Sequence, residues 1–287
     1  MKKDAWSEAS FAATSELWGI SEKEKEDLVE LGQCVRDVDY YKNEPSEVLR
    51  FLRARPNDPK ASEAMFRKMV SWRIQEDVDN ALDNRPEQVI IDHLPGAILQ
   101  GRDKDGDPIF VNRSGRMDLP GLIKQFGSQA LVQYTIWIRE LVINGAWREK
   151  PELERGRPFT RVLIIEDLKD FALTKFVRNP GLVSLYGELV RIDQENYPES
   201  AKKIIVIRTP ALFRVVWNLV RGFFDPYIVE KLEFCGEKDV EKCLSKYLDL
   251  SVLPAAVLPN KGKGHSEVGM PVNFEGGKFD PKKTVGH

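Results

Sequence analysis

The chain has 287 residues, of which 42% are hydrophobic, and its 43 basic and 45 acidic residues leave a formal net charge of -2. This length allows one or two domains with a large core. A near-neutral chain lacks the positive field on which nucleic-acid binding depends, so we expect no nucleic-acid partner.

Neither the first 19 residues nor any later segment is apolar for long enough to form a secretory signal or a membrane span. The longest aliphatic runs are Val162–Ile165 and Ile204–Ile207. The three cysteines, Cys34, Cys235 and Cys243, are odd in number and widely spaced, which predicts neither a disulfide framework nor a metal motif. We therefore expect a cytoplasmic protein whose membrane contacts are peripheral and transient.

Helices are predicted for the N-terminal region, residues 1–88. Ser21 and Glu24 have the spacing of a capping box, and Asp58 and Pro59 fit the cap and first turn of a second helix. A polar break at Asp83–Pro86 ends this region.

From about Ala97, short β-branched runs alternate with helical patterns. Two central strands are aliphatic at every position, which is typical of a mostly parallel sheet covered by helices on both faces. The turn Asp103–Gly106 predicts a hairpin between the first two strands. We predict strands at Ala97–Gln100, Pro108–Asn112, Arg161–Glu166, Lys203–Arg208 and Leu232–Gly236, and helices at Ser128–Ile143, Leu182–Asn196, Pro210–Phe224, Asp225–Lys231 and Lys238–Tyr247. Beyond Pro259 the composition predicts a loop or disordered extension.

Catalytic motifs are absent from the sequence: it has no nucleophile elbow, phosphate-binding glycine loop, paired histidines or CxxC. We interpret His93 as an ordinary polar residue, and Glu166, Asp167 and Asp170 as a solvated loop of carboxylates at the end of a strand. The sequence therefore predicts a protein that is not an enzyme, with no catalytic residues, metal or cofactor.

The segment Thr209–Pro226 predicts one helix of about fourteen residues, with Thr209 as cap and Pro210 in the first turn. Its polar residues form a narrow stripe, and its apolar surface exceeds what packing on a sheet requires. Buried core, an internal ligand and a membrane surface could each cover that surplus. Two arginines beside Phe223 and Phe224 also resemble an interfacial helix whose aromatic rings insert among acyl chains.

Several of these segments together resemble the CRAL-TRIO family. They are LRFLRAR at Leu49–Arg55, Trp72–Arg73, DKDGDPIFV, VLIIEDLKDF, and ENYPESAKKIIVIRTPALFRVVWNLVRGFFDP. The resemblance covers roughly Val38 to Pro259. It implies an α/β fold in which a small all-helical unit (1–88) precedes an α/β/α lipid-binding domain (89–260) and a C-terminal tail (261–287). In that domain a helical gate closes an internal lipid pocket.

The resemblance also implies site residues. Head-group contacts carry over to Arg73, Thr174, Glu199 and Lys231, although Ile74 and Ala172 replace polar residues that relatives have there. Arg73 and Glu199 could equally form a structural ion pair, with Lys231 a solvated charge. The gate and hydrophobic pocket would comprise Phe213, Val216, Trp217, Val220, Phe223 and Phe224.

We therefore expect a carrier that binds one phospholipid or other lipophile, such as a phosphoinositide, phosphatidylcholine, tocopherol, retinoid, sterol or haem, and exchanges it with membranes. The alternative is a lipid-sensing adaptor that regulates a protein partner or a lipid-metabolising enzyme. The sequence names no protein partner.

Overall fold

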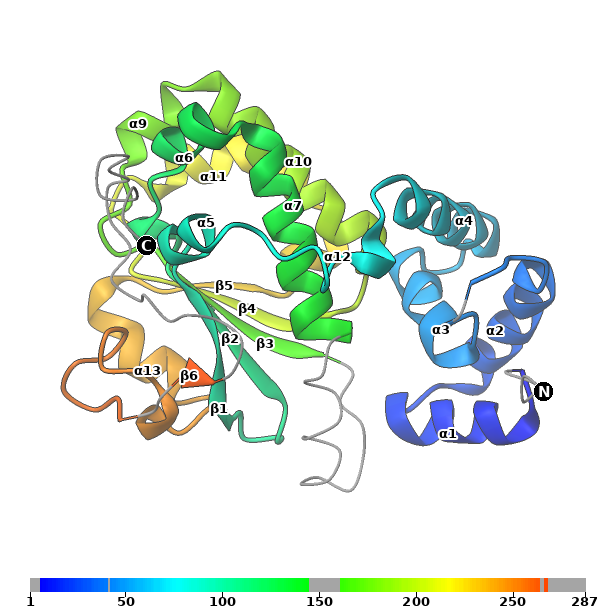
Figure 1. Cartoon of the computed structure of the whole chain (residues 1–287). Coiled ribbons are helices and arrows are strands. Elements are labelled where there is room, and N and C mark those ends of the chain that lie inside the picture. The colour runs from blue at the N-terminus through cyan, green and yellow to red at the C-terminus, as the bar shows by residue number, and fades with distance from the viewer. Residues whose placement is uncertain (1–5, 41, 145–160, 264–265, 268–287) are drawn as a thin grey trace.

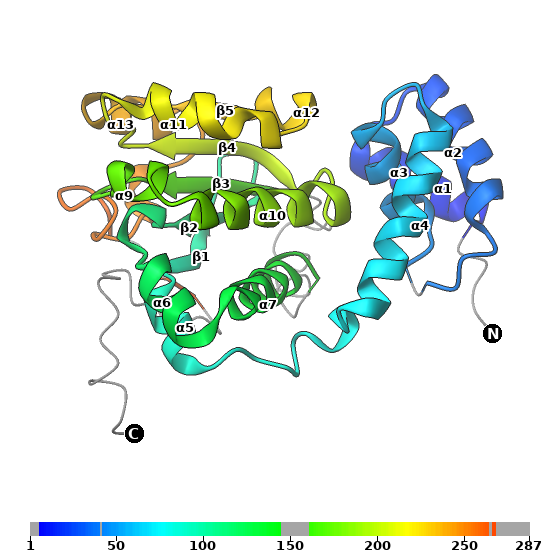
Figure 2. The ribbon, with the colours of Figure 1, turned by 90° about the horizontal axis from the view of Figure 1, so that it is seen from above.

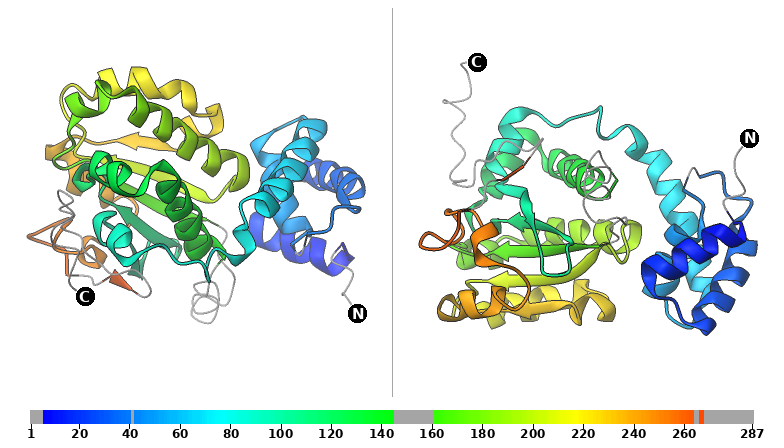
Figure 3. Two further views of the ribbon diagram at one scale, coloured as in Figure 1. Left: turned by 45° about the horizontal axis from the view of Figure 1, so that its top comes forward. Right: turned by 90° about the horizontal axis from the view of Figure 1, so that it is seen from below.

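The computed structural model describes residues 6–40, 42–144, 161–263 and 266–267. Four helices form the N-terminal unit: α1 (Glu8–Trp18), α2 (Glu22–Val35), α3 (Pro45–Ala54) and α4 (Pro59–Gln75). They enclose a separate core that includes the fully buried Leu28, Phe51 and Phe66. Figures 1 and 3 show this helical unit at one end of the α/β domain.

The predicted helix starts in this unit are confirmed. The Ser21 side chain accepts from the amide of Glu24 while the Glu24 side chain accepts from the amide of Ser21, which is the reciprocal capping box. Asp58 caps α4, which begins at Pro59. These bonds satisfy amide groups that a helix start otherwise leaves without partners.

One mixed sheet, with strand order β5-β4-β3-β2-β1-β6, forms the middle of the second domain. The strands β2 (Pro108–Asn112), β3 (Val162–Asp167), β4 (Ala201–Ile207) and β5 (Leu232–Phe234) are parallel, as the aliphatic runs predicted. The hairpin between β1 (Gly96–Arg102) and β2 is also confirmed. Within the C-terminal tail, the two-residue strand β6 (Ser266–Glu267) pairs with β1, so these residues are not the loop that was predicted. His265 and residues 268–287 lie outside the described residues.

Helices cover the sheet on both faces (Figure 1). On one side lie α5 (Gln88–His93), α6 (Leu119–Phe126), α7 (Ser128–Arg139), α9 (Leu173–Val177) and α10 (Pro180–Asn196), and on the other side lies α13 (Val240–Leu244). Because successive side chains of a strand point to opposite faces of the sheet, the apolar core has two parts, one on each face. Leu163, Ile165, Ile205 and Ile207 pack toward α13, whereas Phe110 and Ile164 pack toward α7 and α10.

Two sequence interpretations are wrong because they depend on folding in three dimensions. Cys235 follows β5 and Cys243 lies on α13, and the two form a buried disulfide with a Cα–Cα distance of 6.7 Å. Asp167 is fully buried rather than solvated, and its carboxylate lies 3.0 Å from Arg208 Nη1 and 3.5 Å from Arg113 Nε. These charges neutralise a buried carboxylate, which would otherwise be costly.

His93 ends α5, where its Nδ1 lies 2.8 Å from the Val89 carbonyl oxygen.

Candidate functional site

The predicted gate is shorter than the sequence pattern indicated. The helix α11 spans Phe213–Val220, a 3-10 turn follows at Arg221–Phe223, and α12 (Pro226–Val229) begins after Asp225. Thr209 is not its cap, because the Thr209 amide and hydroxyl both donate to the Cys235 carbonyl, at 3.0 and 3.1 Å. The gate is therefore fixed at its start to the end of β5, and Figure 2 shows α11 on the β5 side of the sheet.

The inner side of the gate is apolar and aromatic. Val216 and Val220 are buried in a cluster with Phe176 and Leu182, and Phe213, Trp217, Phe223 and Phe224 pack around them. Ring contacts connect α11 to the sheet and to α10: the centroid distances are 5.2 Å for Phe213–Phe234, 5.0 Å for Trp217–Phe234, 5.8 Å for Trp217–Phe224 and 6.3 Å for Tyr186–Phe224. All six gate residues inferred from the sequence thus lie in one connected apolar region.

The outer side of the gate also has apolar side chains, beside exposed polar ones. Leu212, Val215 and Leu219 are 66%, 49% and 42% exposed, and Arg214 and Arg221 are exposed beside them. In this structure Phe223 packs on Gly187 of α10 and Phe224 contacts Trp217 and Tyr186. The interfacial interpretation of the Phe–Phe pair stays a prediction, and the outward-facing aliphatic side chains of the gate are Leu212, Val215 and Leu219.

Hydrogen bonds hold the far end of the gate. Gln194 of α10 donates from Nε2 to the Phe223 carbonyl at 2.8 Å and accepts from the Asp225 amide at 3.0 Å through Oε1. The Asp225 carboxylate also pairs with Arg55 of the helical unit at 2.8 Å. The gate end is therefore bound to both domains.

The head-group positions inferred from the family are occupied by ion pairs. Arg73 is buried, and its guanidinium nitrogens lie 2.8 Å from a Glu140 carboxylate oxygen and 2.5 Å from an Asp79 carboxylate oxygen. The ion pair between Arg73 and Glu199 that the sequence allowed therefore does not form. Burial opposes the charge of Arg73, but the Glu140 hydrogen bonds and charge outweigh it and raise the pKa of Arg73.

Lys231 Nζ lies 2.5 Å from Glu199 Oε1, so Lys231 is paired and is not a solvated charge. Arg161 is 3.7 Å from the other oxygen of the Glu199 carboxylate. Burial lowers the pKa of Lys231, and the Glu199 carboxylate offsets that effect only in part.

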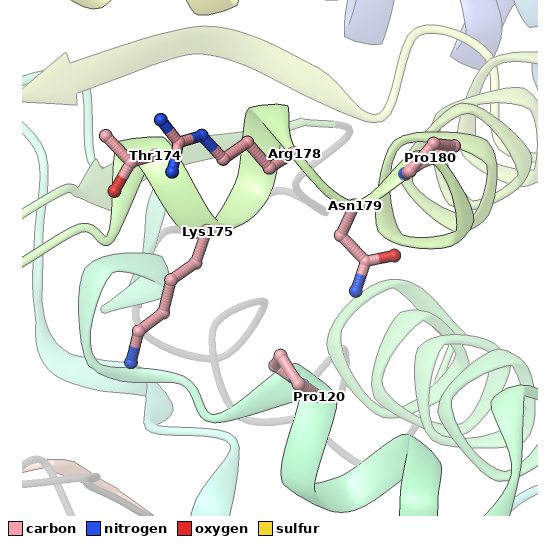
Figure 4. Close-up of a pocket in the computed structure, with 6 residues that line it drawn as sticks. All are labelled: Pro120, Thr174, Lys175, Arg178, Asn179 and Pro180. Atoms are coloured by element: carbon pink, nitrogen blue, oxygen red, sulfur yellow. The ribbon is translucent and has the colours of Figure 1, made fainter.

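Thr174 lies apart from these three residues, in an open pocket of about 480 Å³. The pocket is lined from α6, α9 and the start of α10 by Pro120, Thr174, Lys175, Arg178, Asn179 and Pro180 (Figure 4). Lys175 and Arg178 were not singled out from the sequence. Their signal was two cations three residues apart, directly before an Asn-Pro helix start.

Glu166 is a polar residue on the sheet face that packs toward α7 and α10. It lies two residues after Ile164 on β3 and therefore on the same face. Its carboxylate accepts hydrogen bonds from Asn112 Nδ2 at 3.2 Å and from the Ser114 hydroxyl. Burial raises the pKa of Glu166 to about 6, and these two hydrogen bonds oppose the rise.

A family model described as the CRAL/TRIO domain matches residues 96–257, the segment that contains strands β1 to β5, the pocket and the gate. The chain belongs to the CRAL/TRIO family. Among its CRAL/TRIO relatives, Protein real-time of Drosophila pseudoobscura pseudoobscura is 30% identical over 244 residues, which are 83% of this chain and 36% of that protein. Protein real-time of Aedes aegypti is 28% identical over 254 residues, 86% of this chain and 38% of that protein.

The chain thus spans less than two fifths of the length of these CRAL/TRIO relatives. The crystal structure of Sfh5 shares the fold, with a TM-score of 0.62 at 16% identity and 96% coverage of both chains. Among the described residues, no helix is both long and apolar enough to cross a bilayer.

Proposed function

We propose that this chain binds one phospholipid or other lipophile beneath α11 and exchanges it with a membrane when the gate opens. One observation carries the proposal: the gate segment Leu212–Val220 has apolar side chains on both its inner and its outer side. Its inner side buries Val216 and Val220, while Leu212, Val215 and Leu219 face outward. A helix that only covers a core needs one apolar face, whereas a gate that contacts acyl chains when open uses both.

The energetics of lipid transfer explain why such a gate is useful. Moving a phospholipid with ~30 methylene groups into water costs ~0.8 kcal/mol for each group, or ~24 kcal/mol in total. A barrier of that height allows roughly one escape per day. A carrier docked with its gate open gives the chains an apolar path throughout, so that exchange becomes fast without any catalytic group.

The outer side of the gate has the chemistry that membrane docking requires. Aliphatic side chains can enter the acyl region while arginines bind lipid phosphates. Leu212, Val215 and Leu219 provide the first group, and Arg214 and Arg221 the second. A cytoplasmic carrier of this kind would contact the membrane only transiently, because so small an apolar area gives weak binding.

A vesicle-transfer assay tests this proposal. Wild-type protein should move fluorescent phosphatidylcholine from donor to acceptor vesicles, and Leu212→Asp with Leu219→Asp should reduce the rate at least about tenfold, since two charges would have to enter the membrane. Val29→Asp is the matched control, because Val29 is 41% exposed on α2, away from the gate. Transfer that is absent in the wild type, or equal in all three proteins, would refute the proposal.

A further inference from the structure

We propose that Cys235 and Cys243 form a redox switch of the gate: the disulfide restrains α11, and reduction to two thiols releases it. The inference rests on the proposed function for the role of α11 as a gate. Its structural basis is that the disulfide joins α13 to the residue that holds the start of the gate.

The gate is held by the end of β5. Phe234, the last residue of this strand, has ring-centroid distances of 5.2 Å to Phe213 and 5.0 Å to Trp217. The carbonyl of the next residue, Cys235, accepts both hydrogen bonds from Thr209. Movement of α11 away from the sheet therefore depends on how firmly residues 232–235 are held.

Backbone pairing alone holds these residues weakly. Strand β5 has three residues, lies at one end of the strand order and pairs with β4. Cys235 adds one hydrogen bond, from its amide to the Val206 carbonyl at 2.8 Å. A short edge strand belongs to the parts of a protein that open locally at a low cost in free energy. A cross-link at this position therefore changes how often the strand and the gate move.

The disulfide is such a cross-link, and it lies on the face of the sheet opposite the gate. Because side chains alternate along a strand, Phe234 points toward α11 while Cys235 points toward α13. Figure 1 shows α11 and α13 on opposite faces of the sheet. Cys235 and Cys243 are buried in one apolar cluster with Val240 and Leu244 of α13. The bond thus ties the support of the gate to a packed core.

Other contacts keep α13 in place when the disulfide is reduced. Glu233 lies on the same face as Cys235, and its carboxylate accepts from Lys246 Nζ and from the Tyr247 hydroxyl, each at 2.6 Å. Cys243 Sγ lies 3.2 Å from Glu233 Oε1, so the reduced thiol can donate there. Reduction therefore removes the covalent restraint and leaves the packing of α13 intact.

Thiol–disulfide exchange supplies a balanced reaction for the switch. In a cytoplasmic carrier, as proposed above, the dithiol is the resting state, because disulfides in that compartment are transient. One protein thiolate attacks a small disulfide such as oxidised glutathione and releases one glutathione thiol. The second thiolate attacks the mixed disulfide and releases another. Two protein thiols and one small disulfide become one protein disulfide and two small thiols, which take up the protons.

The buried sulfur atoms become accessible through local opening of α13. This helix has five residues, and so short a helix has little stability of its own. The cysteines are eight positions apart, and the loop-closure entropy of so short a cross-link corresponds to at most about a 60-fold change in an opening equilibrium. The switch therefore modulates the gate and does not block it completely.

Hydrogen exchange tests the inference on the full chain with Cys34→Ser. Cys34 is an exposed free cysteine, and its replacement prevents cross-links between chains. The protein is oxidised with glutathione disulfide or reduced with dithiothreitol, and a mass lower by two hydrogen atoms confirms the bond. Amides of residues 213–224 should exchange about 10- to 60-fold faster in the reduced protein. Amides of α4, in the helical unit, should exchange equally in both states.

A matched variant shows which cysteines are responsible. Cys34→Ser with Cys243→Ala should exchange at the faster rate under both conditions. The inference is overturned if the Cys34→Ser protein forms no disulfide, if its gate amides exchange equally in the two states, or if the redox effect persists without Cys243. The comparison of the two states of Cys34→Ser needs no change at the switch itself, so it decides the question even where Cys243→Ala unfolds the chain.

Phosphatidylcholine transfer by the two forms of Cys34→Ser separates this inference from the proposed function. We expect the oxidised form to transfer lipid more slowly than the reduced form. Equal transfer in both forms would refute the switch and leave the carrier function intact. Redox-dependent exchange of the gate amides without any transfer would refute the carrier function and leave the redox control of α11 intact.

Discussion

Arg55 and Asp225 form an ion pair of 2.8 Å between residues that lie 170 positions apart in the chain. Arg55 follows the last helical residue of α3 in the N-terminal unit, and Asp225 follows the gate. The pair therefore connects the helical unit to the segment whose movement would admit a ligand. Through this contact the N-terminal region can influence gate opening as well as contribute a separate core.

We expect Arg55→Ala to speed lipid transfer modestly. The two side chains are 31% and 30% exposed, so that solvent screens the pair and limits its contribution to about 0.2–1 kcal/mol. The transfer rate should rise by no more than about fivefold, and high salt should produce a similar rise in wild type. Arg67→Ala, which breaks an exposed pair with Asp37 inside the helical unit, is the control and should leave the rate unchanged.

Gln194→Leu should favour gate opening more strongly than Arg55→Ala does. The substitution removes both hydrogen bonds to the backbone at Phe223 and Asp225, and part-buried groups that lose their partners cost about 1–3 kcal/mol. Opening of the gate relieves that cost, because water then binds the freed groups. Hydrogen exchange of the amides in residues 213–224 should accelerate roughly 10- to 100-fold.

Gln133→Leu is the matched control for this measurement. Gln133 makes one exposed hydrogen bond of 3.4 Å to Glu76, far from the gate in sequence. Equal exchange in the two variants would show that Gln194 does not hold the gate closed.

Glu166→Gln should stabilise the protein near neutral pH and not in acid. The pKa of Glu166 is about 6 in the folded protein and 4.5 in the reference state, so the folded form binds more protons between these values. Stability therefore falls as the pH rises from about 4.5 to 6, by about 2 kcal/mol, and the loss persists at pH 7. A glutamine cannot ionise, so the variant should lack this loss.

Urea unfolding of wild type and Glu166→Gln at pH 4 and pH 7 measures the effect. The difference in unfolding free energy between the two proteins should move in favour of the variant by about 2 kcal/mol from the lower to the higher pH. Glu230→Gln, at an exposed position, is the control. A difference that does not depend on pH would contradict the raised pKa.

Much of the fold could be predicted from the sequence because periodicity reports burial directly. The aliphatic runs at Val162–Ile165 and Ile204–Ile207 predicted the two central strands, and the turn at Asp103–Gly106 predicted the β1–β2 hairpin. The short helices α5, α6 and α9 were missed. Helices of five to eight residues have little propensity of their own and form here because tertiary packing holds them.

The candidate site was harder to predict, because its contacts join distant parts of the chain. The composition of Thr209–Pro226 indicated a gate, but it could not show that Phe223 and Phe224 turn inward onto α10. Residue types also could not reveal that Arg73 pairs with Glu140, 67 positions away, rather than with Glu199. The Cys235–Cys243 disulfide likewise depends on how β5 meets α13.

Native mass spectrometry of the full chain, after incubation with vesicles and their removal, shows whether the protein carries a lipid. We expect a complex of one chain with one lipid molecule, which organic extraction releases and which a second, isotopically labelled vesicle population replaces. A folded chain that retains no lipophile from vesicles of any composition would refute the carrier function.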